Sequence, residues 1–281
     1  MKIKFKNAVI VGPGLIGGSI GLVLRKQMLA ENIIGVARHK ATLLKAKKKE
    51  SITIGVTDLK QAVADADLVI LATPVMAIKG VLQSIGNLLK KDCIVIDVGS
   101  TKAEIVAYAE KVLPKNVYFI GTHPMAGSEK AGAEFACDSL FNDSICFIIK
   151  TPKSDRAALA TVTNLWKMLG ARTVLIDPKQ HDDIVAQISH LPHLLSVALV
   201  DSVCPGFIKF AAAGFKDTTR IAAGDPEIWR DISFSNKEAI LTAISNFEKK
   251  LNSIKKAIKN NQKQVLVRQL INVKRKRDSL K

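Results

Sequence analysis

Apolar residues are grouped along this chain in two different ways. Up to residue 177, short continuous apolar runs of β type alternate with stretches whose apolar residues recur at helical spacing. These runs lie at 8–11, 32–38, 66–74, 93–99, 116–124, 145–150 and 172–177. Strands of this kind, separated by helices, indicate a mainly parallel sheet covered on both faces. After residue 178 no convincing strand follows, and helical spacing continues at 179–203, 206–213, 226–232 and 236–260.

Three glycines follow the first apolar run at the spacing Gly12-x-Gly14-x-x-Gly17. In a turn that binds a dinucleotide, the first glycine permits the tight turn from strand to helix. The second lets the backbone approach a pyrophosphate, and the third lets the helix pack against the strand. We therefore expect an α/β Rossmann-type doubly wound domain at 1–177 and an all-α domain at 178–281. The residues expected to hold the cofactor are Gly12, Gly14, Leu15, Ile16, Gly17, Arg38, Thr73 and Pro74.

The end of the second strand bears on the choice of nucleotide. Domains specific for NAD place an acidic residue there, which binds the ribose 2′-hydroxyl. This chain has Ala37 and Arg38 at that point. A guanidinium can form a forked pair with a 2′-phosphate, although Arg38 could also be an ordinary solvated residue. The sequence therefore favours NADP over NAD.

Composition limits the class of protein further. The 281 residues suffice for about two domains. The four cysteines form no CxxC pair, which argues against a metal site and for a reducing, cytoplasmic compartment.

The net charge of +17 suits anionic partners, but aromatic residues are not interleaved with the basic C-terminal stretch, so nucleic acid is not the expected partner. The first apolar stretch is interrupted by glycines and shorter than the roughly 20 residues of a membrane span, so we expect a soluble protein.

Polar residues that follow the strands are candidates for chemistry, because ligands bind at the carboxyl ends of a doubly wound sheet. His123 directly follows a predicted strand, and imidazole suits proton transfer near neutral pH. The alternative is a histidine that is merely hydrogen-bonded in its loop. Other polar residues in such places lie at 73–74, 97–102 and 122–129.

The helical half contains two more candidate groups. His190 and His193 share a helix face, and Pro192 between them frees a backbone carbonyl and favours a kink. Without a carboxylate ligand nearby, this pair is a poor metal site. Lys216 and Arg220 lie one helical turn apart and suit capture of a carboxylate, unless they form surface ion pairs.

Several of these segments occur together, in the same order, in one enzyme family. VGPGLIGGS at 11–19, ATP at 72–74, DVGSTK at 97–102, GTHPMAGSE at 121–129, ISHLPH at 188–193 and GFKDTTR at 214–220 resemble the prephenate dehydrogenase family. That family includes arogenate and cyclohexadienyl dehydrogenases. The resemblance spans nearly the whole chain.

The resemblance implies oxidative decarboxylation of a small dicarboxylate, prephenate, to 4-hydroxyphenylpyruvate in tyrosine biosynthesis. Hydride leaves C4 for the nicotinamide of NAD(P), and the ring carboxylate departs as CO2. His123 matches the catalytic histidine that withdraws the proton of the 4-hydroxyl, and Ser100 matches the serine that holds the same hydroxyl. Arg220 matches the residue that binds a substrate carboxylate. The matching residues around the pocket are Lys216, Ser128, Glu129, Ser189 and His193.

Glu129 and His193 favour prephenate over arogenate, because family members that prefer arogenate often lack the acidic residue and the second histidine at these two positions. Two further possibilities are another dehydrogenase on the same fold, acting on hydroxy acids or imines, and a non-enzymatic protein that binds NADP(H) or nucleic acid. A helical half beside a Rossmann domain also suggests, by analogy, a homodimer.

Overall fold

The computed structural model describes residues 4–127, 130 and 132–280. Contacts along the chain divide it into two compact units, Met1–Asn236 and Lys237–Lys281. The first unit holds the sheet and also residues 178–236. The domain boundary expected after residue 177 therefore stays a prediction, since the division into compact units falls elsewhere.

Eight strands form one sheet, in the order β3-β2-β1-β4-β5-β6-β7-β8. Neighbouring strands are parallel except β6 and β7, which are antiparallel. The chain begins in the middle of the sheet and moves outward first on one side and then on the other, so a topological switch point lies between β1 and β4. The strands are β1 (Phe5–Val11), β2 (Ala30–Val36), β3 (Ile54–Val56), β4 (Leu68–Leu71), β5 (Ile94–Asp97), β6 (Tyr118–Pro124), β7 (Ile145–Ile149) and β8 (Arg172–Ile176).

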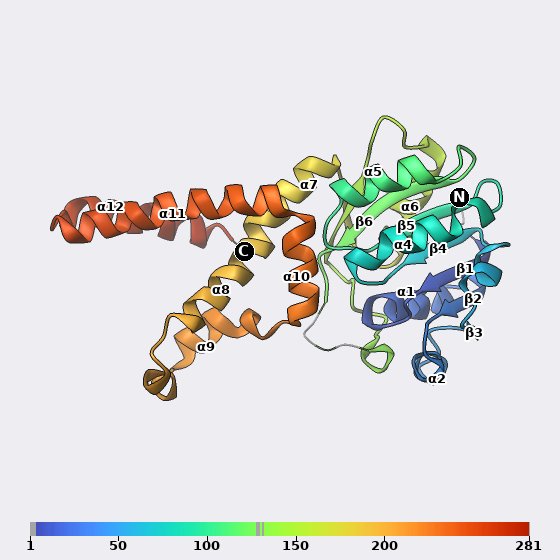
Figure 1. Ribbon diagram of the computed structural model, residues 1–281, viewed down its shortest axis with the longest axis horizontal. Helices are drawn as coiled ribbons and strands as arrows, with labels where there is room; N and C mark the ends of the chain where they lie inside the picture. The colour runs from blue at the N-terminus through green and yellow to red at the C-terminus, as the bar shows by residue number, and fades with distance from the viewer. Residues whose placement is uncertain (1–3, 128–129, 131, 281) are drawn as a thin grey trace. The chain divides into compact units, whose positions relative to one another are not determined.

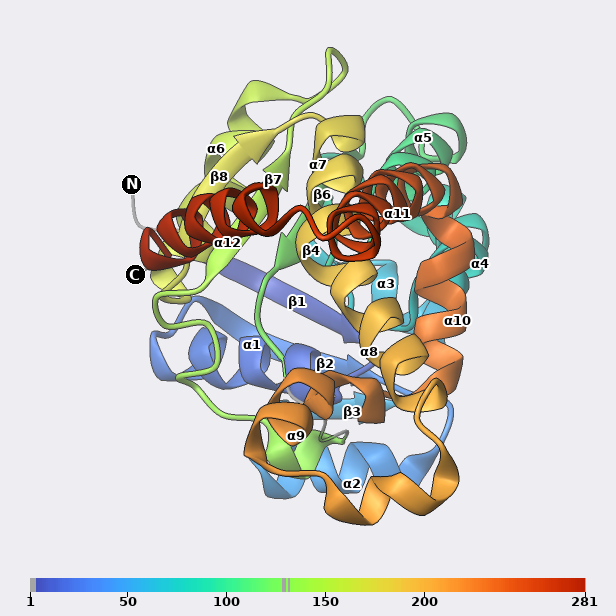
Figure 2. The same ribbon diagram turned by 90° about the vertical axis from the view of Figure 1, so that its left-hand side faces the viewer.

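The expected mainly parallel, doubly wound sheet is thus confirmed. Figure 2 shows β1, β2 and β3 following one another across it. The short strand β3 was not expected, because its three residues contain too few apolar positions to form a run.

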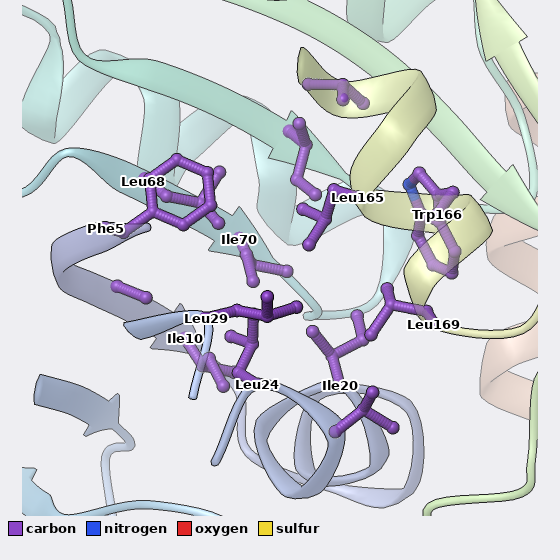
Figure 3. Packing of buried hydrophobic residues seen from close by; sticks show 14 of the residues in the cluster. Phe5, Ile10, Ile20, Leu24, Leu29, Leu68, Ile70, Leu165, Trp166 and Leu169 are labelled. Carbon is purple, nitrogen blue, oxygen red and sulfur yellow. The ribbon is translucent and has the colours of Figure 1, made fainter. Parts of the chain in front are cut away.

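Helices cover both faces of the sheet (Figure 1). They are α1 (Leu15–Lys26), α2 (Lys40–Lys48), α3 (Leu59–Val63), α4 (Val75–Ile85), α5 (Ala103–Val112) and α6 (Arg156–Met168). Alternate residues of β1 point to opposite faces: Ile10 packs with α1 and α6, whereas Val9 packs with α3, α4 and α5. Figure 3 shows Ile20 and Leu24 of α1 and Leu165 of α6 gathered around the sheet. Burial on both faces explains why the strands read as continuous apolar runs.

Helices α7 (Pro178–Val185), α8 (Leu191–Asp201), α9 (Ala213–Thr219) and α10 (Pro226–Ser235) complete the first unit. A π-helical turn, Ala186–His190, joins α7 to α8. It lies just before Pro192, which cannot donate a backbone hydrogen bond, so the wider turn occurs where the sequence predicts a disturbance. The prediction of a helix at 206–213 is wrong. A 3-10 turn occupies Pro205–Phe210, with no buried side chain to stabilise it, and α9 begins only at Ala213.

By length and composition alone, the run Pro178–Asp201 could cross a membrane, and it is the only such run in the part of the chain that the structure describes. Its polar side chains His181, Asp182 and His190 are nevertheless buried within the first unit.

The second unit consists of α11 (Lys237–Lys259) and α12 (Lys263–Asp278), which contact each other. Asn261 joins them in the left-handed conformation, with φ of 52°, which asparagine tolerates well at the end of a helix. Gln269 of α12 donates a hydrogen bond of 2.8 Å to the hydroxyl of Ser253. Helix α12 was not expected as a separate helix; it lies in the basic C-terminal stretch, and none of its side chains is buried.

Candidate active site

The glycine turn after β1 has the geometry of a nucleotide cradle. Gly12 has φ of +88°, and a Cβ there would lie 2.6 Å from the carbonyl oxygen of Ala72. A Cβ on Gly17 would lie 2.5 Å from the carbonyl oxygen of Gly12. Nothing lies within 4 Å of the corresponding point on Gly14, so the backbone is open to a ligand there. No side chain caps α1, whose first residues Leu15 and Ile16 present the positive end of the helix dipole to that space.

Two other strand ends adjoin this turn. Arg38 follows β2 and is exposed, and no carboxylate stands at Ala37. Thr73 follows β4, and Pro74 precedes the first residue of α4. The hydroxyl oxygen of Thr73 is buried without a hydrogen-bond partner among the described residues, and its methyl group lies 3.3 Å from the point where a Cβ on Gly12 would be. An open glycine backbone, an uncapped helix and an unpaired buried hydroxyl fit a bound nucleotide.

A buried ion pair shapes the loop after β5. Asp97 and Lys102 are fully buried and pair with each other. Asp97 also accepts a hydrogen bond of 2.9 Å from the backbone N–H of Gly99, which folds the loop back on the strand. Because a buried charge without its partner is costly, this pair fixes the loop that carries Ser100.

His123 lies at the end of β6 and is nearly buried. Its Nδ1 is 2.9 Å from Nε2 of His181, and Nδ1 of His181 is 2.7 Å from Oδ1 of Asp182. Burial lowers the pKa of His123 well below its ordinary 6.5, and the neighbouring His181 and Lys102 lower it further. His123 is therefore neutral near pH 7 and able to accept a proton.

A cavity of about 560 Å³ joins the strand ends to the helical segment. Ser100 and His123 line it from the sheet, while Ser189 and Arg220 line it from the helices. Ile228 and Trp229 of α10 form an apolar wall. The volume suits a small organic ligand, to which His123 offers a base and Arg220 a cation; Lys130 and Asp225 also line the cavity.

The other predicted pocket residues are placed differently. His193 does not line the cavity: it lies behind it, stacked on Trp229 with ring centroids 3.5 Å apart. Lys216 is exposed on α9 and is not part of the lining. Ser128 and Glu129 lie outside the described residues.

His190 is buried beside the site rather than in it. Its Nδ1 is 3.2 Å from the amide nitrogen of Asn236, which also donates 2.8 Å to the carbonyl oxygen of Asp182. Burial lowers the pKa of His190 to about 4. Within the part of the chain that the structure describes, no three histidine, cysteine or acidic side chains form a group that could hold a metal ion.

Sequence reasoning missed His181, Asp182 and Trp229. His181 and Asp182 carry no recognisable motif, and they reach His123 only because α7 packs against α5 and β7. Trp229 could have been singled out as one of two tryptophans in the chain.

Comparison with known proteins identifies the family. The nucleotide-binding domain model of prephenate dehydrogenase matches residues 20–175, and the dimerization domain model matches residues 177–272. The chain is 34% identical to a prephenate dehydrogenase of Bacillus subtilis, over 99% of this chain and 77% of that protein.

Solved structures agree with this assignment. A prephenate dehydrogenase from Aquifex aeolicus, in complex with hydroxyphenyl propionate and NAD+, is 34% identical with a TM-score of 0.94, and each chain is covered completely. An arogenate dehydrogenase from Synechocystis is 31% identical with a TM-score of 0.85, over 97% of this chain and 99% of that one. From the family models, the identities and the shared fold together, this chain belongs to the prephenate dehydrogenase family.

Proposed function

We propose that this protein converts prephenate and NAD(P)+ into 4-hydroxyphenylpyruvate, CO2 and NAD(P)H. The observation that carries the proposal is a cavity lined by both neutral His123, at the carboxyl end of β6, and cationic Arg220. Prephenate is a cyclohexadienyl dicarboxylate with a hydroxyl at C4, so it offers one group to a base and others to a cation. Family membership supports the same reaction.

His123 acts on the 4-hydroxyl. Its imidazole accepts a hydrogen bond from that hydroxyl and takes the proton as hydride leaves C4. Ser100 orients the same hydroxyl from the loop after β5. The nicotinamide, when bound, accepts the hydride. The C–C bond to the ring carboxylate then breaks, its electrons complete the aromatic ring as CO2 departs, and protonated His123 returns its proton to the phenolate oxygen.

Arg220 binds a substrate carboxylate through charge-assisted hydrogen bonds from the helical side of the cavity. We further propose Ser189 as a polar contact in the same cavity. Lys216, Ser128, Glu129 and His193 remain proposed substrate-binding residues on the family resemblance, with His193 acting through the stacked ring of Trp229.

NADP is the proposed cofactor. The exposed Arg38 after β2 and the missing carboxylate at Ala37 support it, since no acidic group opposes a 2′-phosphate there. The residues proposed to hold the nucleotide are Gly12, Gly14, Leu15, Ile16, Gly17, Arg38, Thr73 and Pro74.

Prephenate is the proposed substrate in preference to arogenate. Two relatives support this choice by name, the prephenate dehydrogenases of Bacillus subtilis and Lactococcus lactis, the latter 36% identical over 89% of this chain and 70% of that protein.

We also propose a cytoplasmic homodimer that pairs through residues 178–281, taken as one substrate-binding and dimerisation domain. The match to a dimerization domain supports this assembly. Large apolar side chains such as Ile188, Phe210 and Phe234 are exposed on the helical segment and suit burial against a second copy. Light scattering on the purified protein tests it.

Steady-state rates with prephenate and arogenate, each with NADP+ and NAD+, test the function. We expect the highest kcat/KM with prephenate and NADP+. A folded protein that binds NADP(H) but turns over neither substrate would contradict the proposal.

A further inference from the structure

We propose that His181 and Asp182 are positioning residues that hold His123 in the tautomer with its proton on Nδ1 and its lone pair on Nε2. This inference rests on the proposed role of His123 as the base. Neither residue lines the cavity, so neither touches the substrate. The geometry is a relay of two short hydrogen bonds, from His123 through His181 to Asp182.

The direction of the relay is set at Asp182. Its Oδ1 accepts a hydrogen bond of 2.8 Å from the backbone N–H of Lys102, and its Oδ2 accepts one of 2.9 Å from Ala103. These amides form the N-terminus of α5, which no side chain of its own caps. A helix N-terminus favours a carboxylate over a neutral carboxyl group. Asp182 is therefore an acceptor, and Nδ1 of His181 must be the donor.

The direction of the hydrogen bond between His123 and His181 follows from the charge of His181. Its ring is fully buried and packs edge-on against Phe147, with centroids 5.3 Å apart. Burial lowers the pKa of His181 below its ordinary 6.5, so it carries one ring proton near pH 7. With that proton on Nδ1, Nε2 of His181 can only accept, and it accepts from Nδ1 of His123. The lone pair of His123 is left on Nε2.

The remaining charged and titratable groups around His123 do not change its tautomer. Lys102 is neutralised by Asp97, and His190 receives the amide N–H of Asn236. That amide is oriented by its second bond to the carbonyl oxygen of Asp182, so Nδ1 of His190 is an acceptor. His190 therefore holds its proton on Nε2, the opposite tautomer from His123.

These opposite tautomers can be measured directly. In the full-length protein labelled with ¹⁵N-histidine, without cofactor, near pH 7.5, nitrogen chemical shifts distinguish protonated from bare ring nitrogens. We expect a bare Nε2 on His123 and a bare Nδ1 on His190. His39, which is exposed on the loop after β2, is removed by His39→Asn to assign its signals and to serve as the matched control.

Two variants of His181 separate positioning from packing. In His181→Gln the amide oxygen can reach the position of the imidazole Nε2 and still accept a hydrogen bond from His123. In His181→Asn the shorter amide can form a hydrogen bond with Asp182 but cannot reach His123. We expect the Asn variant to shift His123 toward a proton on Nε2 and to lower kcat about 100-fold with KM within about threefold. The Gln variant should keep the tautomer and lose at least tenfold less activity.

A proton on Nε2 of His123 in the unsubstituted protein would overturn the inference, as would an unchanged tautomer in His181→Asn. Equal losses of kcat in the two variants would also overturn it, because packing alone would then explain them. If the tautomers are as expected but prephenate is not turned over, the proposed function fails and the relay does not.

Discussion

The glycine turn after β1 and the histidine cluster after β6 lie at the same end of one sheet but are built in opposite ways. The turn is made of backbone within six consecutive residues, and its geometry comes from the absence of side chains. The cluster consists of the side chains of His123 on β6 and of His181 and Asp182 on α7, held by backbone N–H groups at the start of α5, with His123 and His181 separated by 58 positions. Binding a phosphate thus needs local chain geometry, whereas tuning a base needs tertiary packing.

This difference predicts unequal responses to substitution. Side-chain changes in the cluster should alter the chemical step, while changes in the turn should alter backbone geometry and cofactor affinity.

The largest expected effect is on the base itself. His123→Asn removes the proton acceptor and should lower kcat by about 100- to 10,000-fold, with little change in KM for prephenate. Stopped-flow or steady-state absorbance of NADPH measures it, with His39→Asn as the control. A folded Asn variant that keeps most of the activity would show that another group takes the proton.

Acid should destabilise the folded protein through His190. His190 is protonated near pH 6.5 in the unfolded chain but only near pH 4 in the folded protein. Between these values the unfolded state binds more protons, so the free energy of unfolding falls as pH falls from 6.5 to 4 and is unaffected by this group above 6.5. The difference between the two pKa values of His190 lowers the free energy of unfolding by about 3 kcal/mol, at roughly 1.4 kcal/mol per pKa unit.

Urea denaturation at several pH values measures this loss. The variant His190→Asn should show a shallower decline of stability with acid than His39→Asn. Identical slopes in the two variants would refute the assignment of the proton uptake to His190.

Within the turn, two glycines should differ sharply. Gly12→Ala must adopt φ near +88° and meets the carbonyl oxygen of Ala72, so we expect about 1–3 kcal/mol of lost stability. Gly14→Ala meets nothing and should change stability by less than about 0.5 kcal/mol, while raising KM for the cofactor. Thermal melts and cofactor titrations check both. Equal destabilisation would contradict the described turn.

The smallest predicted effect concerns the nucleotide. Ala37→Asp introduces a carboxylate that repels a 2′-phosphate and can bind a ribose hydroxyl, so the ratio of kcat/KM for NADP+ to that for NAD+ should fall by about tenfold or more. Arg38→Gln should lower the ratio without raising the rate with NAD+. An unchanged ratio in both variants would show that Arg38 does not bind the nucleotide.

The same contrast explains what the sequence could reveal. The sheet, the covering helices and the glycine turn follow from local patterns, since apolar periodicity and glycine spacing are properties of adjacent residues. His123 and Arg220 were singled out because strand ends and paired cations suggest ligands, and in the structure both line one cavity. The relay through His181 was not found, because it depends on how α7 packs against α5. Helix α12 was missed because it lies in the basic C-terminal stretch and buries no side chain.

The most direct test of the account is a crystal structure with NADP+ and 3-(4-hydroxyphenyl)propionate, a ligand that carries the phenol and one carboxylate of the product class. We expect the phenol oxygen within about 3 Å of Nε2 of His123 and the carboxylate on Arg220. A ligand bound with its hydroxyl away from His123, or outside the cavity, would contradict it.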